Sequence, residues 1–186
     1  MKKLIFLGLI TMLLVFTCTF QDETSISEKI WKYPPQQLLT SEEIEEEIVL
    51  KMERVQEFLK NQKLDGILLT QVRNFYWITA GTVNNQIVLN KDVGAASALI
   101  MKNGSKYLIC NDSEAPRMMN EGMKELGYEL RRYDWYKANP KVDVRAEILK
   151  EISPKGKIGS DIPFPGTVLV ADQFEPLRYS LTDTEI

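Results

Sequence analysis

The chain has 186 residues, of which 44% are hydrophobic and 26% are charged, and its formal net charge is -3. This length suits one globular domain, and the composition excludes a disordered chain and a strongly basic nucleic-acid-binding protein, so we expect no nucleic acid as partner. The sequence contains no histidine. Catalytic triads and zinc-protease helices that depend on an imidazole are therefore excluded.

The first twenty residues have the pattern of an export signal. Lys2 and Lys3 precede an apolar run at residues 4–16. The run is shorter than the roughly 20 residues that cross a bilayer, which favours a cleaved signal over a retained single-span anchor. The residues before Cys18 resemble a bacterial lipoprotein signal, in which the cysteine thiol is acylated. We therefore expect a signal peptide at residues 1–18, lipidation of Cys18, and an exported bacterial protein that is periplasmic or is a membrane-anchored lipoprotein.

A tether and an amphipathic helix are predicted next. Residues 19–39 are polar and include two consecutive prolines, so they fit a tether. Thr40 and Glu43 then fit a capping box, and apolar residues recur at helical spacing from Ile44 to Leu59. Five glutamates at residues 42–47 could hold a cation, but a solvated helix start explains them more simply.

The rest of the chain alternates predicted strands and helices. A buried strand at residues 64–70 is followed by the densest aromatic cluster, at residues 74–81. The later elements are a hairpin of residues 96–101 and 106–110 around an Asn-Gly turn, a helix capped by Ser113 and ended by Gly127, a strand at 128–133, a helix at 142–152 and a final inner strand at 157–161. This order predicts an α/β fold with a mixed sheet and helices on both faces.

The last residues of the sequence have the pattern of a helix N-terminus, but too few residues follow to form a helical turn. Thr182 and Glu185 fit a second capping box, and the sequence stops at Ile186. We therefore expect one folded domain at residues 40–180, followed at 181–186 by the start of a truncated linker helix.

Motifs that carry chemistry are missing from the sequence. Glycine-rich phosphate loops and a serine-nucleophile elbow are absent. Residues 111–114 could offer oxygen ligands to a hard cation, but a loop that caps the following helix is the simpler interpretation. Cys110 lies in an apolar run and is predicted to be a buried core thiol. We predict no catalytic residue and no metal ligand.

The order of six segments resembles the N-terminal domain of the creatinase, prolidase and Xaa-Pro aminopeptidase family. These segments lie at residues 54–59, 64–70, 74–81, 98–110, 157–161 and 176–178, with the last one preceding residues 182–186. The resemblance implies a ribonuclease-H-like domain that precedes a metallopeptidase domain. In that second domain, Asp, Asp, His, Glu and Glu bind two divalent ions such as manganese, cobalt or zinc, so the resemblance implies no cofactor for the residues present here.

The resemblance also implies a role without catalysis. Family N-terminal domains help to build dimers and lend residues to the rim of a neighbouring subunit's active site. The matching segment makes Asn74, Tyr76 and Trp77 the candidate substrate-rim residues. Asn74 stands where some relatives have an acidic residue, which puts a charge contact with substrate in doubt.

Two hypotheses about function follow. The first is a non-catalytic N-terminal domain of an exported Xaa-Pro aminopeptidase-like protein, which serves dimerisation and the rim of a partner's active site in a truncated chain. The alternative is a stand-alone lipoprotein that acts as a binding module. The expected partners are a second copy or a full-length relative, and a proline-containing peptide. Contact with a membrane is expected only through the signal or a lipid anchor.

Overall fold

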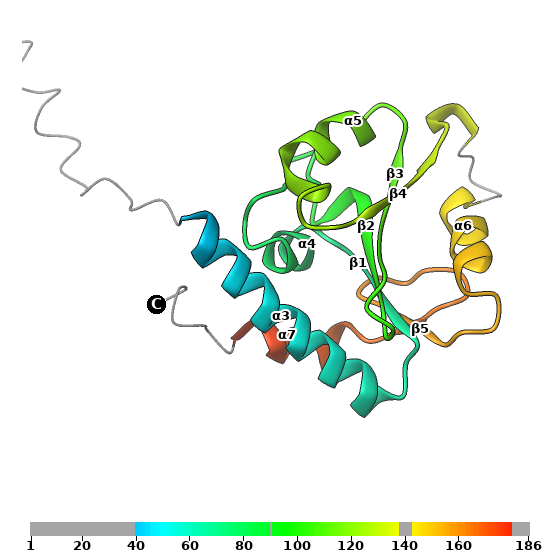
Figure 1. Cartoon of the computed structure of the whole chain (residues 1–186). Coiled ribbons are helices and arrows are strands. Elements are labelled where there is room, and N and C mark those ends of the chain that lie inside the picture. Colours follow the sequence, from blue (N-terminus) through cyan, green and yellow to red (C-terminus); the bar gives the residue numbers. More distant parts are fainter. Residues whose placement is uncertain (1–39, 90, 138–142, 180–186) are drawn as a thin grey trace, which may run out of the picture. The chain divides into compact units, whose positions relative to one another are not determined.

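The computed structural model describes residues 40–89, 91–137 and 143–179, which build a six-stranded sheet (Figure 1). The strands are β1 (Gly66–Gln71), β2 (Val93–Met101), β3 (Lys106–Asn111), β4 (Glu129–Tyr133), β5 (Ile158–Ser160) and β6 (Val168–Leu169), in the order β4-β3-β2-β1-β5-β6. The pairs β1–β2 and β2–β3 are antiparallel, whereas β1–β5, β3–β4 and β5–β6 are parallel. The predicted mixed sheet and its hairpin are therefore confirmed.

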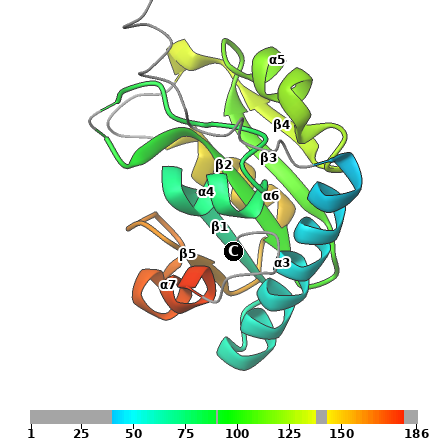
Figure 2. The ribbon, with the colours of Figure 1, turned by 90° about the vertical axis from the view of Figure 1, so that its left-hand side faces the viewer.

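Helices cover both faces of this sheet, as predicted. The larger core unites one sheet face with α3 (Ser41–Gln62), α4 (Val72–Ile78), α5 (Ala115–Met118), the π-helical turn η1 (Met119–Met123) and α7 (Ala171–Tyr179). The smaller core lies on the opposite face, under α6 (Val144–Ile152). Figure 2 shows α3, α4 and α7 in front of the sheet and α6 behind it. Because side chains alternate along a strand, Ile67 and Leu69 enter the larger core while Leu68 enters the smaller one.

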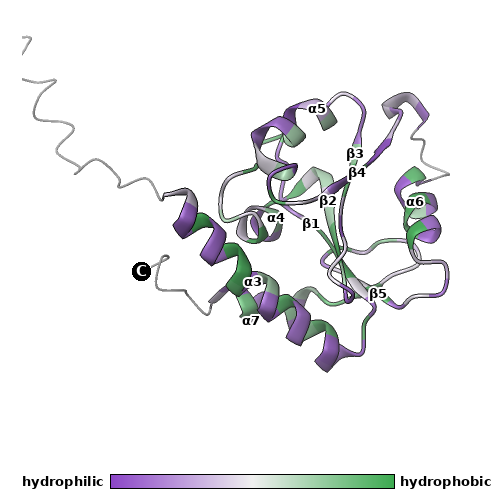
Figure 3. Ribbon diagram, in the orientation of Figure 1, coloured by the Kyte–Doolittle hydropathy of each residue, from purple (hydrophilic) through white to green (hydrophobic). Residues whose placement is uncertain are grey.

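The first helix begins at the predicted capping box. The N–H of Glu43 donates to Thr40 Oγ1 at 3.2 Å, and the N–H of Thr40 donates to Glu43 Oε2 at 2.7 Å. Hydrophobic and hydrophilic residues alternate along α3 (Figure 3), and Val55, Phe58 and Leu59 enter the larger core. The separation is not complete, because Glu47 and Lys51 form a buried ion pair at 2.7 Å, whereas Val49 and Leu50 are exposed. Within the described ranges, no helix has both the length and the apolar character needed to cross a membrane.

The predicted helix at residues 113–127 differs from the structure. Ser113 does not cap it, because its hydroxyl donates to Asn111 Oδ1 at 2.7 Å, and the same oxygen accepts the N–H of Glu114 at 3.0 Å. The helix is also broken: α5 continues into η1, where Gly122 has a φ of +149°. The helical segment ends at Met123 and not at the predicted Gly127, which lies in the following turn with a φ of +75° that favours glycine.

The end of the domain also contains more structure than predicted. The strand β5 is an inner strand, as expected, but it is not the final one, since β6 pairs with its outer side. A two-residue strand has too little periodicity to be predicted. Helix α7 contains Pro176, and an interior proline argues against a helix. Burial of Phe174 against α3 and α4 holds α7 in place, with its ring 5.5 Å from Phe58 and 5.9 Å from Trp77. The predicted signal, tether and linker-helix start lie outside the described residues.

Candidate functional site

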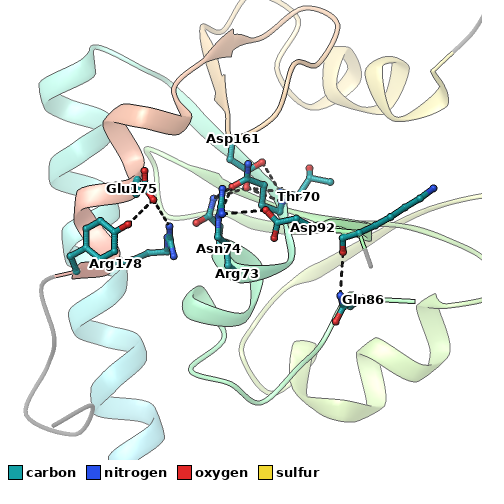
Figure 4. A network of polar contacts seen from close by, with 11 residues as sticks. Thr70, Arg73, Asn74, Gln86, Asp92, Asp161, Glu175 and Arg178 are labelled. Carbon is teal, nitrogen blue, oxygen red and sulfur yellow. Dashed lines mark hydrogen bonds and ion pairs between the residues drawn. The ribbon is translucent and has the colours of Figure 1, made fainter. Parts of the chain in front are cut away.

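A buried carboxylate organises the point where β1 turns directly into α4. Asp161 follows β5, which runs parallel to β1, so the ends of both strands meet at one edge of the sheet. Its two carboxylate oxygens accept the N–H of Thr70 at 2.8 and 3.0 Å and the N–H of Gln71 at 2.9 Å. The side-chain amide of Asn74 donates to the same carboxylate at 2.9 Å (Figure 4). Asp161 therefore supplies the acceptors that the turn itself lacks.

Burial and hydrogen bonding have opposite effects on the pKa of Asp161. Asp161 is 1% exposed, and burial raises the pKa of its carboxyl above the ordinary value. The donors from Asn74, Thr70 and Gln71 oppose part of this rise in pKa. The carboxylate has no access to a ligand, so its role is to fix the start of α4 and the side chains that α4 presents.

An open pocket of about 530 Å³ lies beside α4. Arg73 and Tyr76 line it from the helix, and Gln86, Leu89 and Asp92 line it from the loop before β2. Arg73 forms an ion pair with Asp92 at 3.4 Å, and both side chains are about half exposed. Such a pair is only weakly stabilising in solvent, so these charged groups remain available to an incoming ligand or partner.

The loop that closes this pocket is fixed at both ends. Asn85 is fully buried, and its amide donates to the carbonyl oxygens of Thr70 at 3.2 Å and Ala96 at 2.8 Å. At the second end, the N–H of Val72 donates to the carbonyl oxygen of Asp92 at 2.8 Å. These bonds tie the loop to β1, to β2 and to the first residue of α4.

The middle of the loop exposes three consecutive apolar residues, Ile87, Val88 and Leu89, which we call the apolar tip. Leu89 is 90% exposed, the highest value among the exposed large hydrophobic residues of the described chain. The side-chain amide of Gln86 donates to the carbonyl oxygens of Leu89 at 3.1 Å and Lys91 at 3.2 Å, which shapes the loop beneath the tip. Figure 4 shows Gln86 and one of these bonds. A shaped, contiguous apolar surface of this kind is typical of an interaction site.

The three candidate rim residues have different environments. Asn74 is 3% exposed and is bound to Asp161, whereas Tyr76 is 49% exposed and lines the pocket. Trp77 is buried, with its ring packed edge-on against Phe174. The fold therefore brings only Tyr76 to the surface, and contact of these residues with a partner's substrate stays a prediction. Cys18, the predicted lipidation site, lies outside the described residues.

The described residues offer little support for a metal site or a reactive thiol. There, no group of three Cys, Asp or Glu side chains is placed to hold a metal ion, and the sequence supplies no histidine. Cys110 is buried, as predicted, and its thiol lies 3.8 Å from Met118 Sδ. Burial raises the pKa of the Cys110 thiol to about 12, which opposes formation of the reactive thiolate.

Sequence reasoning missed the partners that shape this site. Asp161 was placed at the end of a predicted strand, but the sequence gives no sign that its carboxylate contacts residues about 90 positions earlier. No sequence motif includes Arg73 or Asp92. A run of three apolar residues between Gln86 and Asn90 was the available signal for the exposed tip.

Comparison with known proteins identifies relatives of this domain. The model of the creatinase/prolidase N-terminal domain matches residues 51–186. A structure of the dipeptidase PepE from Mycobacterium ulcerans matches with a TM-score of 0.52 and 12% identity, over 75% of this chain and 38% of that one. An Xaa-Pro aminopeptidase from Streptococcus thermophilus gives a TM-score of 0.48 and 18% identity, over 70% of this chain and 98% of that one. The N-terminal domain of a metallopeptidase from Corynebacterium diphtheriae gives 0.44 and 13%, over 73% and 90%. No protein of curated function matches the sequence.

Proposed function

Because the chain belongs to the creatinase/prolidase N-terminal domain family, we propose that it is the non-catalytic half of an Xaa-Pro peptidase assembly. In this role it pairs with a second chain and lines the rim of that chain's active site. Of the domains found in this family, these 186 residues contain the N-terminal one. Its contribution to the reaction is therefore binding and positioning, and bond cleavage belongs to the partner's catalytic domain.

The exposed apolar tip is the observation that carries this proposal. Ile87, Val88 and Leu89 are all about half exposed or more, although the loop that holds them is bound firmly to the sheet. A loop that is already ordered loses little conformational entropy when a partner covers it. Burial of three large aliphatic side chains would contribute several kcal/mol, at about 25 cal/mol per Å² of apolar surface.

The pocket beside the tip supports a role at a substrate rim. Tyr76 presents an aromatic ring, and Arg73 and Asp92 present one charge of each sign. A proline-containing peptide offers a ring that can pack on Tyr76 and charged ends that can replace one member of the ion pair. We therefore propose Tyr76 and Arg73 as the rim residues that touch substrate, while Asn74 acts through Asp161.

The proposed role of this chain does not use a metal ion of its own. The resemblance implies manganese, cobalt or zinc in the partner's catalytic domain, where the ions would activate water for peptide hydrolysis. Residues 40–89, 91–137 and 143–179 do not fit such a centre, since no suitable group of ligands lies together there. We therefore expect the full chain alone to leave a proline dipeptide intact in the presence of manganese.

Pairing can be tested by introducing a charge into the apolar tip. We expect the full chain to form a complex with a full-length family member, or with a second copy, in light scattering after size exclusion. Leu89→Glu should lower the affinity at least tenfold, because the carboxylate would lose its hydration in the interface. Val168→Glu is the matched control, since Val168 is also an exposed apolar residue but lies on β6. The proposal would be refuted if the natural chain stayed monomeric under all conditions, or if Leu89→Glu bound its partner with the same affinity as the natural chain.

We also propose that the protein is exported and carries a lipid on Cys18. The pattern of the first twenty residues supports this, with two lysines, an apolar run and then the cysteine. The expected result is an N-terminal peptide that begins at an acylated Cys18 when the membrane fraction is analysed by mass spectrometry. An unmodified Cys18 in that fraction would contradict the lipid anchor, and it would leave the pairing proposal unaffected.

A further inference from the structure

Within the residues that the structure describes, no strand pairs with the outer edge of β4. The strand pairs with β3 on one side and is the last strand on the other. The N–H of Asp112 donates to the carbonyl oxygen of Tyr133 at 2.9 Å, so the main-chain groups of Tyr133 point towards β3. Since successive residues of a strand point these groups to opposite edges, Leu130 and Arg132 present theirs outwards. Among the described residues, nothing outside the β3–β4 pair bonds to them.

Two exposed aromatic rings stand just beyond the end of this edge. Trp135 and Tyr136, in the short helix η2 (Trp135–Lys137), are 63% and 64% exposed and lie edge to face with ring centroids 6.1 Å apart. Their positions are fixed, because the N–H of Trp135 donates to Asp112 Oδ1 at 3.0 Å and the hydroxyl of Tyr136 donates to Asp134 at 3.2 Å. Tryptophan, tyrosine and arginine are the residues that most often dominate binding energy at interfaces.

The charges along the edge favour an acidic partner. Arg131 pairs with Glu129 at 2.8 Å, and Asp134, whose pKa is lowered by Lys137 and to a smaller extent by Arg132, pairs with Lys137 at 2.6 Å. Residues 129–137 carry three basic and two acidic side chains. The strand therefore carries an unbalanced positive charge next to its open main-chain groups. An extended segment with a carboxylate opposite Arg132 would gain a charge-assisted contact as well as the main-chain bonds.

A second copy of the chain fits this edge less well. In an antiparallel pair that uses the outward groups of both copies, Leu130 would face Arg132 of the other copy. Arg131 would then face its own counterpart with the Cα atoms about 4.5 Å apart. Like charges directly opposite each other are destabilising, so the register that bonds Leu130 and Arg132 of both copies is disfavoured.

We propose that the outer edge of β4, together with Trp135 and Tyr136, binds an extended acidic segment of a partner protein as an added strand. The outward N–H and C=O groups of Leu130 and Arg132 supply the main-chain bonds, the two rings hold an apolar side chain, and Arg132 selects a carboxylate. This surface comprises residues that the pairing proposal does not use, so either proposal can fail without the other.

The first test uses a capped six-residue peptide that alternates valine and glutamate, and a counterpart with glutamine in place of glutamate. With the full chain, we expect saturable binding of the acidic peptide in fluorescence anisotropy and slower hydrogen exchange at the amides of Leu130 and Arg132. The glutamine peptide should bind several-fold more weakly. Amides that are already protected in the free monomer, or no change in their exchange with peptide, would overturn the proposal.

Two variants at Arg132 separate the contribution of the main-chain N–H to binding from the contribution of the side-chain charge. Arg132→Pro removes the outward N–H but leaves the bonds to β3, so it should fold and lose at least tenfold in affinity. Arg132→Ala keeps the N–H and should abolish only the preference for glutamate over glutamine. Equal binding by Arg132→Pro and the natural chain would overturn the proposal. Protection that rises with protein concentration, without peptide, would instead identify a second copy as the occupant and would also overturn it.

Discussion

Asp161→Ala is expected to lower the free energy of unfolding by about 3 kcal/mol at neutral pH, because several buried donors would lose their acceptor at once. The N–H groups of Thr70 and Gln71 and the amide of Asn74 all donate to this carboxylate at distances of 2.8–3.0 Å. Urea unfolding of the full chain, followed by circular dichroism, measures the loss as a lower midpoint with an unchanged slope. A loss below about 0.5 kcal/mol would mean that water replaces the carboxylate.

The pH dependence of Asp161 gives a second and independent measurement. Burial raises the pKa of this carboxyl in the folded state, so the folded protein binds its proton more tightly than the unfolded chain does. The part of the stability that depends on protonation of Asp161 is therefore complete below the ordinary pKa of aspartate and is lost as the pH rises through the folded pKa. We expect the unfolding free energy of the natural chain, relative to Asp161→Asn, to fall as the pH rises above the ordinary pKa of aspartate.

The comparison with Asp161→Asn cancels the titration of every other group that the variant leaves unchanged. Asparagine keeps the shape of the side chain but cannot ionise, and it turns an NH₂ group towards donors. If the relative stability of the natural chain rose with pH, the four hydrogen bonds to the carboxylate would outweigh its burial. That outcome would contradict the direction of the pKa shift.

The Asp161 network also connects stability with the proposed function. Because Asp161 fixes Gln71 and Asn74, it sets the direction in which α4 leaves the sheet. Arg73 and Tyr76 lie on that helix and line the pocket. A folded Asp161→Asn variant should therefore pair with a partner through the unchanged apolar tip while holding the pocket residues less firmly.

Gly94→Ala is expected to cost about 3 kcal/mol, although it adds a single methyl group to a strand. A Cβ atom at this position would lie 2.1 Å from Nδ2 and 2.2 Å from Cγ of Asn85, which is far inside van der Waals contact. Asn85 is fully buried and holds the carbonyl oxygens of Thr70 and Ala96, so it cannot move without breaking both hydrogen bonds. Urea unfolding of the single variant measures this cost.

The matched control places the same methyl group in an Asn85→Ala background. Without the amide side chain the clash disappears, so Gly94→Ala should there cost less than about 1 kcal/mol, and the two changes should couple by about 2 kcal/mol. Equal costs in both backgrounds would show that the strand, and not Asn85, excludes a side chain at Gly94. Since Asn85 also anchors the loop below the apolar tip, Gly94→Ala should weaken pairing with a partner in addition to lowering stability.

Local patterns in the sequence predicted most of the elements, because these elements follow from interactions between near neighbours. The capping box at Thr40 and the helical spacing up to Leu59 define α3, and the Asn-Gly turn defines the β2–β3 hairpin. The two errors have different causes. The Ser113 hydroxyl donates to Asn111 and so does not cap α5, which is a local competition, whereas the burial of Phe174 against distant residues holds α7 as a helix despite Pro176.

The candidate site was predicted only in part, and Asn74, Tyr76 and Trp77 show why. All three belong to one short helix and were treated alike, because a sequence segment does not reveal which side of a seven-residue helix faces the core. Asn74 and Trp77 turn inwards and Tyr76 turns outwards. The resemblance singled out this segment as a whole, and only the packing of α4 distinguished its surface residue from its buried ones.

The amino-acid composition and the order of the predicted segments indicated one α/β domain without imidazole chemistry. The match to the creatinase/prolidase N-terminal domain is consistent with this fold. These properties are carried by residue types and local periodicity, which require no knowledge of distant contacts. Only the tertiary structure decided that Asp161 contacts Thr70, that Asn85 fills the space above Gly94, and that no other described residue covers the apolar tip or the outer edge of β4. These features depend on how the sheet, loops and helices pack, and a local sequence pattern does not specify that packing.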